Sequence, residues 1–255
     1  MASSTGDVTS PTPARAVAPG EVQGPDSAQV KAMFGEIAPR YDLANQVLSG
    51  GVHHLWRNRV VRWSGAKKGD AVLDCATGTG DLAIAFAKVV GDEGRVVGTD
   101  FSPQMLAPAP EKAARAGVKA EFAEADVTQL AYQDDEFDVS SISFGIRNVQ
   151  DPGQGIAELG RVTRSGGVVM VLEFGQPVIP GFRGVYNLYS RVLLPRIGGL
   201  ITGQGSAYRY LQDSSAQFPC RRDFVELMMK TGRFSSVEFR SLTGGIAYMY
   251  RGVVA

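Results

Sequence analysis

The sequence predicts an α/β fold in which helices cover a mostly parallel sheet. Three observations support this prediction. Short apolar runs alternate with helix-like segments, a glycine-rich turn follows the first run, and the last two runs lie close enough in sequence to pair antiparallel. The alternation is that of successive βαβ units, which place their strands parallel in one sheet.

The N-terminal part of the chain divides into a tail and a helical segment. Residues 1–25 hold four of the 13 prolines and few charges, so we expect a disordered tail. A helix-like pattern follows at residues 27–38 and ends before Pro39, and an aromatic-bearing stretch continues to residue 63. We expect residues 26–63 to form a helical cap on a core of residues 71–255.

The core shows strand-like and helix-like segments in alternation. The expected strands of the parallel part are residues 71–75, 95–100, 119–126, 137–144 and 166–174. The expected helices between them are residues 81–90, 103–116 and 154–163. After an apolar, arginine-dotted stretch at 181–205 come a helix at 221–231 and two last strands at 235–242 and 247–253. The strands at 137–144 and 166–174 are apolar along most of their length, which is typical of central parallel strands.

Composition excludes several classes of protein. The chain has 26 basic and 26 acidic residues, so it lacks the positive field that gathers nucleic acid. It contains no run of about 18 apolar residues that would span a bilayer. Its cysteines, Cys75 and Cys220, are too far apart in sequence for a metal-ligand cluster or a disulfide framework, so we expect a cytoplasmic protein with no metal site. From the charge balance we expect no nucleic-acid partner.

The glycine-rich turn fits two kinds of cofactor. Gly78, Gly80 and Ala83 form a GxGxxA pattern between a strand and a helix, and Asp100 ends the next strand. This pattern is the fingerprint of dinucleotide binding, so an NAD(P)-dependent oxidoreductase is one reading.

Acidic residues around the turn favour the other cofactor. Asp74 and Asp81 flank the turn and would repel a pyrophosphate, whereas they suit the cationic sulfonium of S-adenosyl-L-methionine. Asp100 is then expected at the ribose hydroxyls and Asp126 beside the adenine, because ligands bind at the carboxyl ends of such strands. Helix-dipole or strand-end roles for Asp74 and Asp81 are the alternative.

Three stretches carry a resemblance to a known family. They are YDLANQVLSGGVHHLW (41–56), SISFGIRN (141–148) and RVTRSGGVVMVLEFG (161–175). The sequence resembles the class I, Rossmann-like methyltransferases, and within them the C-methyltransferases of ubiquinone and menaquinone biosynthesis. The resemblance implies a seven-stranded sheet whose last strands are antiparallel and which carries a helical N-terminal cap. One departure is Ala76, which stands where the family has the first glycine of the turn.

The resemblance also implies the site residues. The expected cofactor residues are Asp74, Gly78, Thr79, Gly80, Asp100, Asp126, Val127 and Ser143. The implied substrate is a polyprenylated quinol, with demethylmenaquinol favoured and the ubiquinone-pathway benzoquinol also open. A small-molecule methyltransferase with another substrate remains an alternative.

Carbon methylation requires a group that stabilises or forms a phenolate on the ring. Arg147 is expected to hold that oxygen as a permanent cation, with Asn148 orienting it, and a structural salt bridge is the other reading of Arg147. His53 is the candidate base, or a packed core histidine. Tyr41 and Asp42 are expected either to close the cap over both ligands or to pack between helix and loop.

The stretch 181–203 suggests a further partner. Arg183, Arg191 and Arg196 lie among apolar and aromatic residues, a composition that suits the interface of a bilayer. We expect peripheral contact at the inner membrane face, where a lipid-soluble quinol is collected. A partly buried helix or the contact surface of a homodimer fits the stretch equally well.

Overall fold

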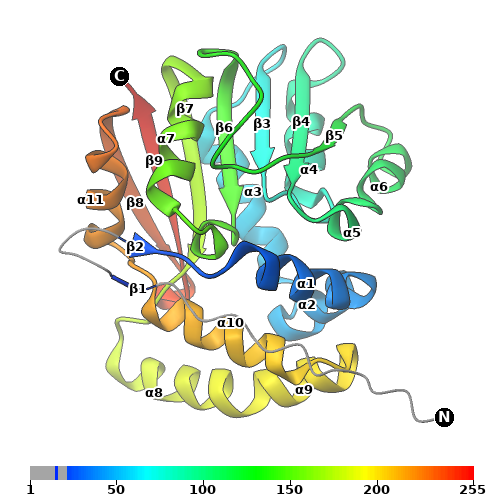
Figure 1. Ribbon diagram of the computed structural model, residues 1–255, viewed down its shortest axis with the longest axis vertical. Coiled ribbons are helices and arrows are strands. Elements are labelled where there is room, and N and C mark those ends of the chain that lie inside the picture. Colours follow the sequence, from blue (N-terminus) through cyan, green and yellow to red (C-terminus); the bar gives the residue numbers. More distant parts are fainter. Residues whose placement is uncertain (1–14, 17–21) are drawn as a thin grey trace.

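A seven-stranded sheet forms the centre of the computed structural model, which describes residues 15–16 and 22–255 (Figure 1). The strands run in the order β5-β4-β3-β6-β7-β9-β8. Their bounds are β3 (Ala71–Cys75), β4 (Arg95–Asp100), β5 (Glu121–Glu124), β6 (Phe137–Ser143), β7 (Thr163–Phe174), β8 (Phe234–Leu242) and β9 (Ala247–Val254). Strands β5 to β7 pair parallel, and β9 pairs antiparallel with both β7 and β8. This confirms the predicted fold class.

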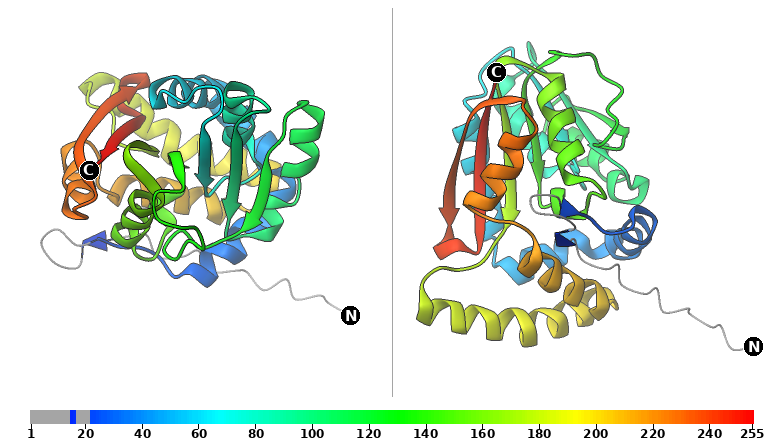
Figure 2. Two further views of the ribbon diagram at one scale, coloured as in Figure 1. Left: turned by 90° about the horizontal axis from the view of Figure 1, so that it is seen from above. Right: turned by 60° about the vertical axis from the view of Figure 1, so that its left-hand side comes forward.

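Helices cover both faces of the sheet (Figure 2). On one face, α3 (Val52–Ser64) and α4 (Asp81–Val90) contribute Trp56 and Phe86 to a buried cluster with the strands. On the other, α7 (Pro152–Val162) and α11 (Arg222–Lys230) contribute Leu159 and Phe224 to a second cluster. Both faces of the central strands are therefore buried, as their continuous apolar runs predict.

The helix expected at 103–116 is two helices. They are α5 (Pro103–Leu106) and α6 (Ala109–Arg115). Pro108 and Pro110 lack backbone N–H groups, and the ring of a proline clashes with the preceding turn of a helix. The segment therefore breaks between residues 106 and 109.

The segment expected to form the cap, residues 26–63, contains α1 (Ser27–Ile37), the 3-10 turn η1 (Ala38–Arg40), α2 (Tyr41–Ser49) and nearly all of α3. Asp26 caps α1 by accepting a hydrogen bond from the Gln29 backbone N–H at 3.0 Å. Most of the tail expected to be disordered lies outside the described residues. Within the described part, β1 (Arg15–Ala16) pairs antiparallel with β2 (Val22–Gln23).

A second group of helices lies beyond the carboxyl ends of the parallel strands, at the bottom of Figure 1. It consists of α8 (Pro180–Leu188), the π-helical turn η3 (Tyr189–Leu193), α9 (Leu194–Thr202) and α10 (Gly205–Gln217). The sequence did not predict α10. No helix in the described part of the chain is long and apolar enough to cross a membrane.

Candidate active site

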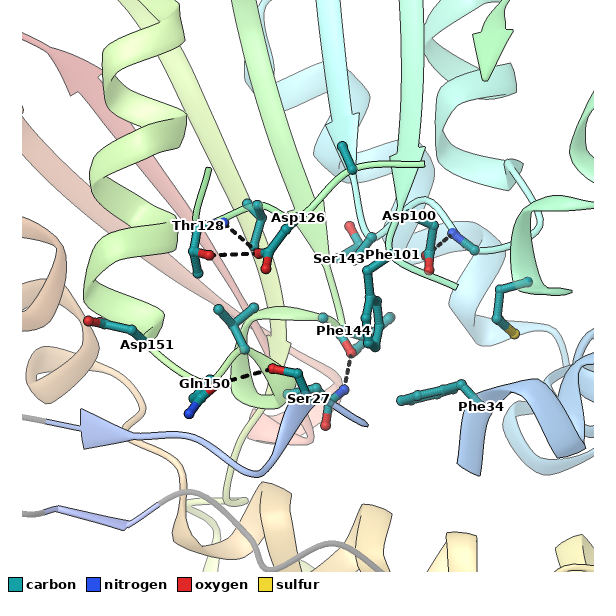
Figure 3. A pocket seen from close by; sticks show the side chains of 18 of the residues that line it. Ser27, Phe34, Asp100, Phe101, Asp126, Thr128, Ser143, Phe144, Gln150 and Asp151 are labelled. Atoms are coloured by element: carbon teal, nitrogen blue, oxygen red, sulfur yellow. Dashed lines mark hydrogen bonds between the residues drawn. The ribbon is translucent and has the colours of Figure 1, made fainter. Parts of the chain in front are cut away.

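A cavity of about 500 Å³ opens at the carboxyl ends of β4 and β6 (Figure 3). Five of the residues predicted to bind the cofactor line it: Gly78, Asp100, Asp126, Val127 and Ser143. They come from four segments that are separate in sequence, because the parallel strands bring their carboxyl ends to one edge of the sheet. Asn148, predicted as catalytic, also lines this cavity.

Ser143 contributes a buried hydroxyl group to this cavity. Its hydroxyl oxygen is buried and has no hydrogen-bond partner among the described residues. A buried hydroxyl without a partner costs free energy, so such a group in a native site calls for an explanation. A polar group of a bound ligand would complete its hydrogen bonding.

Two of the predicted carboxylates line the cavity and stand in different environments. Asp100 is buried and accepts hydrogen bonds from the backbone N–H groups of Gly78 and Ser102, both at 2.9 Å. Its burial raises the pKa of the carboxyl, and the backbone donors oppose that effect. Asp126 is less buried and accepts from the N–H and the hydroxyl of Thr128, both at 2.8 Å, through the single oxygen Oδ1.

The glycine-rich turn has left-handed backbone at three positions. The φ angles are +48° at Ala76, +57° at Gly78 and +84° at Gly80. The methyl group of Ala76 faces Gly145, where an added Cβ would lie 2.4 Å from the Ala76 Cβ. The methyl group of Ala76 therefore fits into the turn because position 145 has no side chain.

The other three predicted cofactor residues do not line the cavity. Asp74 is buried behind the turn, where its carboxylate accepts hydrogen bonds at 2.7 Å from the hydroxyls of Thr77 and Ser141. Burial raises the pKa of Asp74 to about 6. The Thr79 hydroxyl donates to Asp42 of the cap, and Gly80 packs against α6 and β5.

A second cavity, of about 380 Å³, adjoins the first. Its walls are mostly apolar and aromatic, and they include His53 and Arg147, both predicted as catalytic. Its other aromatic side chains include Trp56, Phe174, Tyr186, Tyr189, Tyr208 and Tyr210. Phe34, Tyr41 and Phe144 line both cavities. The two spaces therefore meet between aromatic rings from the cap and from the end of β6.

Arg147 is held in place by buried partners. Its side chain is 2 % exposed, and its Nη1 donates to Glu173 Oε1 at 2.6 Å and to the Phe144 carbonyl at 2.8 Å. Its guanidinium also lies over the Phe174 ring, 5.3 Å from the centroid. The structure thus contains the salt bridge that was the alternative to a catalytic role for Arg147. Arg147 also lines the second cavity, so the two roles are compatible.

Asn148 is also oriented by its neighbours. Its Oδ1 accepts a hydrogen bond from the Tyr210 hydroxyl at 2.8 Å, and its Nδ2 donates to the Phe144 carbonyl at 3.4 Å. Burial raises the pKa of Tyr210 to about 12, so this phenol stays protonated and able to donate.

His53 is neutral at physiological pH. Burial, reinforced by the charge of Arg57 and by His54, lowers the pKa of its imidazole to about 4. Its Nδ1 lies 2.5 Å from the Ser49 hydroxyl. The ring is therefore unprotonated and fixed within the second cavity.

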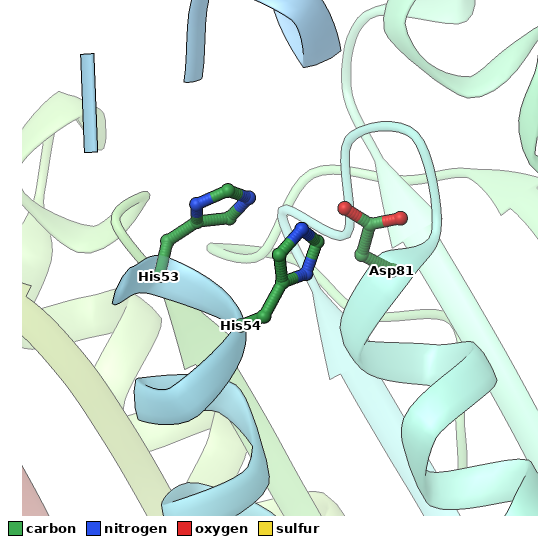
Figure 4. Close-up of side chains that lie close together, drawn as sticks. All are labelled: His53, His54 and Asp81. Atoms are coloured by element: carbon green, nitrogen blue, oxygen red, sulfur yellow. The ribbon is translucent and has the colours of Figure 1, made fainter. Parts of the chain in front are cut away.

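His53, His54 and Asp81 lie close together at the start of α3 and α4 (Figure 4). Their ligand atoms all lie within 4.8 Å of one another. However, Asp81 Oδ2 accepts from Arg57, and Asp81 Oδ1 pairs with Lys112, each at 2.5 Å. Two cations already occupy the carboxylate, which opposes the binding of a metal ion here. The same pairing neutralises Asp81, so this residue does not repel a pyrophosphate as the sequence argument assumed.

Sequence reasoning assigned no role to Glu173, Tyr210 or Phe34. A glutamate at the end of an apolar strand was a usable signal, because a buried carboxylate requires a partner. Tyr210 belongs to the helix that was not predicted, and Phe34 lies on a helix whose placement depends on tertiary packing. Neither carries a local signal.

Comparisons with known proteins agree with this geometry. Residues 22–254 match the model of the ubiE/COQ5 methyltransferase family. The chain is 59% identical over 230 residues to the ubiquinone/menaquinone biosynthesis C-methyltransferase UbiE of Bdellovibrio bacteriovorus, covering 90% of this chain and 97% of that protein. It is 39% identical over 237 residues to UbiE of Teredinibacter turnerae, covering 92% and 95%.

Solved structures share the fold at low identity. Magnesium protoporphyrin IX methyltransferase (ChlM) from Synechocystis PCC 6803, with bound SAH, aligns with a TM-score of 0.63 and 19% identity over 90% of this chain and 100% of that one. The [4+2]-cyclase SpnF has a TM-score of 0.63 and 18% identity over 87% and 78%. The family match confirms the resemblance and S-adenosylmethionine as the cofactor. The chain belongs to the ubiE/COQ5 methyltransferase family.

Proposed function

We propose that this methyltransferase transfers a methyl group to a ring carbon of a reduced quinol, with demethylmenaquinol as a substrate and the ubiquinone-pathway benzoquinol as a second one. The names of its relatives in Bdellovibrio and Teredinibacter support quinols of both pathways. The shared motifs do not distinguish the two rings.

The observation that carries the proposal is the junction of the two cavities. The first holds the predicted cofactor residues, and the second is lined largely by aromatic and apolar side chains that suit a planar ring. They meet at Phe34, Tyr41 and Phe144, and we assign to these aromatic rings the exclusion of water from the space between donor and acceptor. S-adenosylmethionine, when bound, supplies the methyl group as an electrophile.

We assign the ring oxygen to Arg147, which lines the second cavity, and to Asn148, which lines the first. A guanidinium stabilises a developing phenolate without giving up a proton, and buried donors are fixed before the reaction begins. Glu173 offsets part of the charge of Arg147 but holds its orientation. This is the role of a positioning residue.

We assign His53 a more limited role than that of a full base. A phenol has a pKa near 10, and the pKa of His53 is lowered to about 4. Complete proton transfer between them would cost roughly 8 kcal/mol, at 1.36 kcal/mol per unit. His53 therefore accepts a hydrogen bond from the quinol hydroxyl in its neutral form, and Arg147 stabilises the partial negative charge that develops on that oxygen while its proton is shared with the imidazole. The one proton lost per methyl group transferred, from the methylated ring carbon, is released to solvent.

We also propose peripheral membrane contact through α8 and α9, rather than use of this segment as a homodimer contact. Leu188 and Leu200 are 65% and 85% exposed, and Arg196, which lies between them in sequence, is also exposed. The side chains of Arg183 and Arg191 lie outside the described part of the structure. Flotation with anionic liposomes tests the contact, and Leu200→Asp is expected to reduce it. Light scattering in detergent tests the dimer.

The experiment that tests the substrate uses radiolabelled S-adenosylmethionine and two reduced acceptors in detergent, a demethylnaphthoquinol and a methoxybenzoquinol. We expect transfer to both, with loss of transfer in Arg147→Ala and in Asp100→Ala. Transfer to the naphthoquinol alone restricts the enzyme to the menaquinone pathway. If the protein binds the cofactor but labels neither acceptor, the quinol assignment is wrong.

A further inference from the structure

The ammonium group of Lys112, on α6, lies among three oxygen atoms, one from α2 and two from the glycine-rich turn and the start of α4. It lies 2.8 Å from Asp42 Oδ2, 2.8 Å from Thr79 Oγ1 and 2.5 Å from Asp81 Oδ1. An ammonium has three N–H donors, so these acceptors use all of them. We call Asp42, Thr79, Asp81 and Lys112 the Lys112 cluster.

The charges of the cluster are balanced and partly shielded from solvent. Asp81 also pairs with Arg57 of α3, so two carboxylates face two cations. The side chains of Lys112 and Asp81 are 21% and 22% exposed. These interactions lower the pKa of Asp81 against the effect of its burial. Removing Lys112 leaves Asp42 without its cation and Asp81 with one cation instead of two.

The cluster lies behind the glycine-rich turn of the cofactor cavity. The Thr79 hydroxyl accepts from Lys112 and donates to Asp42 Oδ1 at 2.7 Å. The preceding residue, Gly78, lines the cavity and donates its backbone N–H to Asp100. One face of the turn therefore meets the cofactor cavity while the side chain of Thr79 is fastened to the cap.

On the cap side, the cluster includes the sequence neighbour of a residue at the junction of the cavities. Asp42 directly follows Tyr41, which lines both of them. Both residues lie in the first turn of α2. The contacts of Asp42 with Lys112 and Thr79 therefore hold the helical turn that carries Tyr41.

We propose that Lys112 is a positioning residue that fastens the cap to the glycine turn, so that cofactor binding and cap closure are coupled. The coupling is reciprocal: a cofactor that orders the turn stabilises the cap, and a fastened cap increases affinity for the cofactor. The proposal rests on the methyl-donor site and not on the identity of the quinol.

The test compares Lys112→Met with Lys112→Arg and with a matched control, Arg115→Met. Arg115 lies on the same helix, where it pairs with the exposed Glu111 at 3.5 Å. Two quantities are measured on the full chain: the dissociation constant of S-adenosylhomocysteine by calorimetry, and hydrogen exchange of the α2 amides with and without that ligand. The melting temperature of the free protein reports any general destabilisation.

We expect Lys112→Met to bind S-adenosylhomocysteine about tenfold more weakly and to lose the ligand-dependent protection of α2. Lys112→Arg should retain most of the affinity and most of the ligand-dependent protection of α2. Arg115→Met should match the unmodified protein in both. Unchanged affinity in Lys112→Met, or weaker binding with α2 protection intact, overturns the proposal. If Lys112→Met does not fold, Asp42→Ala removes the cap side of the cluster and is held to the same two criteria. Failure of the unmodified protein to bind the ligand would instead contradict the cofactor assignment.

Discussion

Arg147 and Glu173 form an ion pair at 2.6 Å in which both side chains are 2 % exposed, and Arg147 of this pair lines the second cavity. Glu173 Oε1 also accepts from the Phe174 backbone N–H at 2.7 Å. Burial raises the pKa of Glu173, and the Arg147 guanidinium acts against that effect. The pair thus joins the Ile146–Asn148 turn η2 to the end of β7.

Breaking this pair should destabilise the protein strongly. Glu173→Gln leaves the Arg147 guanidinium buried without its counterion, and such changes typically cost about 3–5 kcal/mol. We expect a correspondingly lower urea midpoint, measured by circular dichroism. Glu238→Gln, at an exposed position on β8, is the control and should change the free energy of unfolding by less than about 0.5 kcal/mol. Equal midpoints for the two variants would contradict this account of the pair.

Ser143→Ala should separate ligand binding from stability. The Ser143 hydroxyl is buried without a partner among the described residues, so its removal should leave the free protein as stable or up to about 1 kcal/mol more stable. Affinity for S-adenosylmethionine should fall about fivefold, the equivalent of one hydrogen bond.

Ser140→Ala serves as the matched control for Ser143→Ala. Ser140 is also buried on β6, but its hydroxyl accepts from Thr163 at 2.7 Å. This control should lose stability and keep its affinity. Thermal unfolding and calorimetry check both variants, and a Ser143→Ala protein with unaltered affinity would remove Ser143 from the cofactor site.

The alternation of apolar runs predicted the sheet because a buried parallel strand must be apolar on both faces. The strands 71–75 and 95–100 have the expected bounds for this reason. The same logic predicted that Asp100 and Asp126 would share one cavity, since parallel strands end at the same edge, whereas Ser143, which lines the same cavity, was implied only by the family resemblance.

What the sequence could not predict depends on contacts between distant segments. Thr79 follows the turn pattern, but its hydroxyl is directed to Asp42 of the cap, 37 positions earlier. The neutral state of His53 likewise results from burial and from the nearby charge of Arg57. A local sequence pattern predicts neither the Thr79–Asp42 hydrogen bond nor the neutral state of His53, because both arise only when the cap packs on the core.

The lowered pKa of His53 predicts a specific pH dependence of stability. The unfolded imidazole has a pKa near 6.5, so between pH 6.5 and about 4 the unfolded state binds more protons than the folded state. Stability is therefore lost as the pH falls through this window. Relative to His53→Gln, the unmodified protein should lose about 2 kcal/mol between pH 7 and pH 5.

Urea unfolding at the two pH values measures this difference. Asp74, whose pKa is raised to about 6, contributes a slope of opposite sign, because its folded state binds more protons between pH 3.8 and 6. That contribution is common to both proteins and cancels in the comparison. Parallel pH profiles for the two proteins would show that His53 is not held neutral by the fold.

Ala76 and Gly145 should be energetically coupled. Ala76 has a φ of +48°, a left-handed conformation that costs a residue with a Cβ roughly 1 kcal/mol, so Ala76→Gly should stabilise the protein by about that amount. Gly145→Ala should be destabilising, since its new Cβ would lie 2.4 Å from that of Ala76.

In the double variant the Ala76 methyl group is gone, and the next nearest atom to the new Cβ, on Ile142, lies at 3.3 Å. The loss from Gly145→Ala should therefore shrink by at least about 1 kcal/mol in the Ala76→Gly background, measured as a double-mutant cycle by urea unfolding. Strict additivity of the two changes would mean that the turn and the β6 end relax independently, and that the missing glycine at position 76 is not accommodated by Gly145.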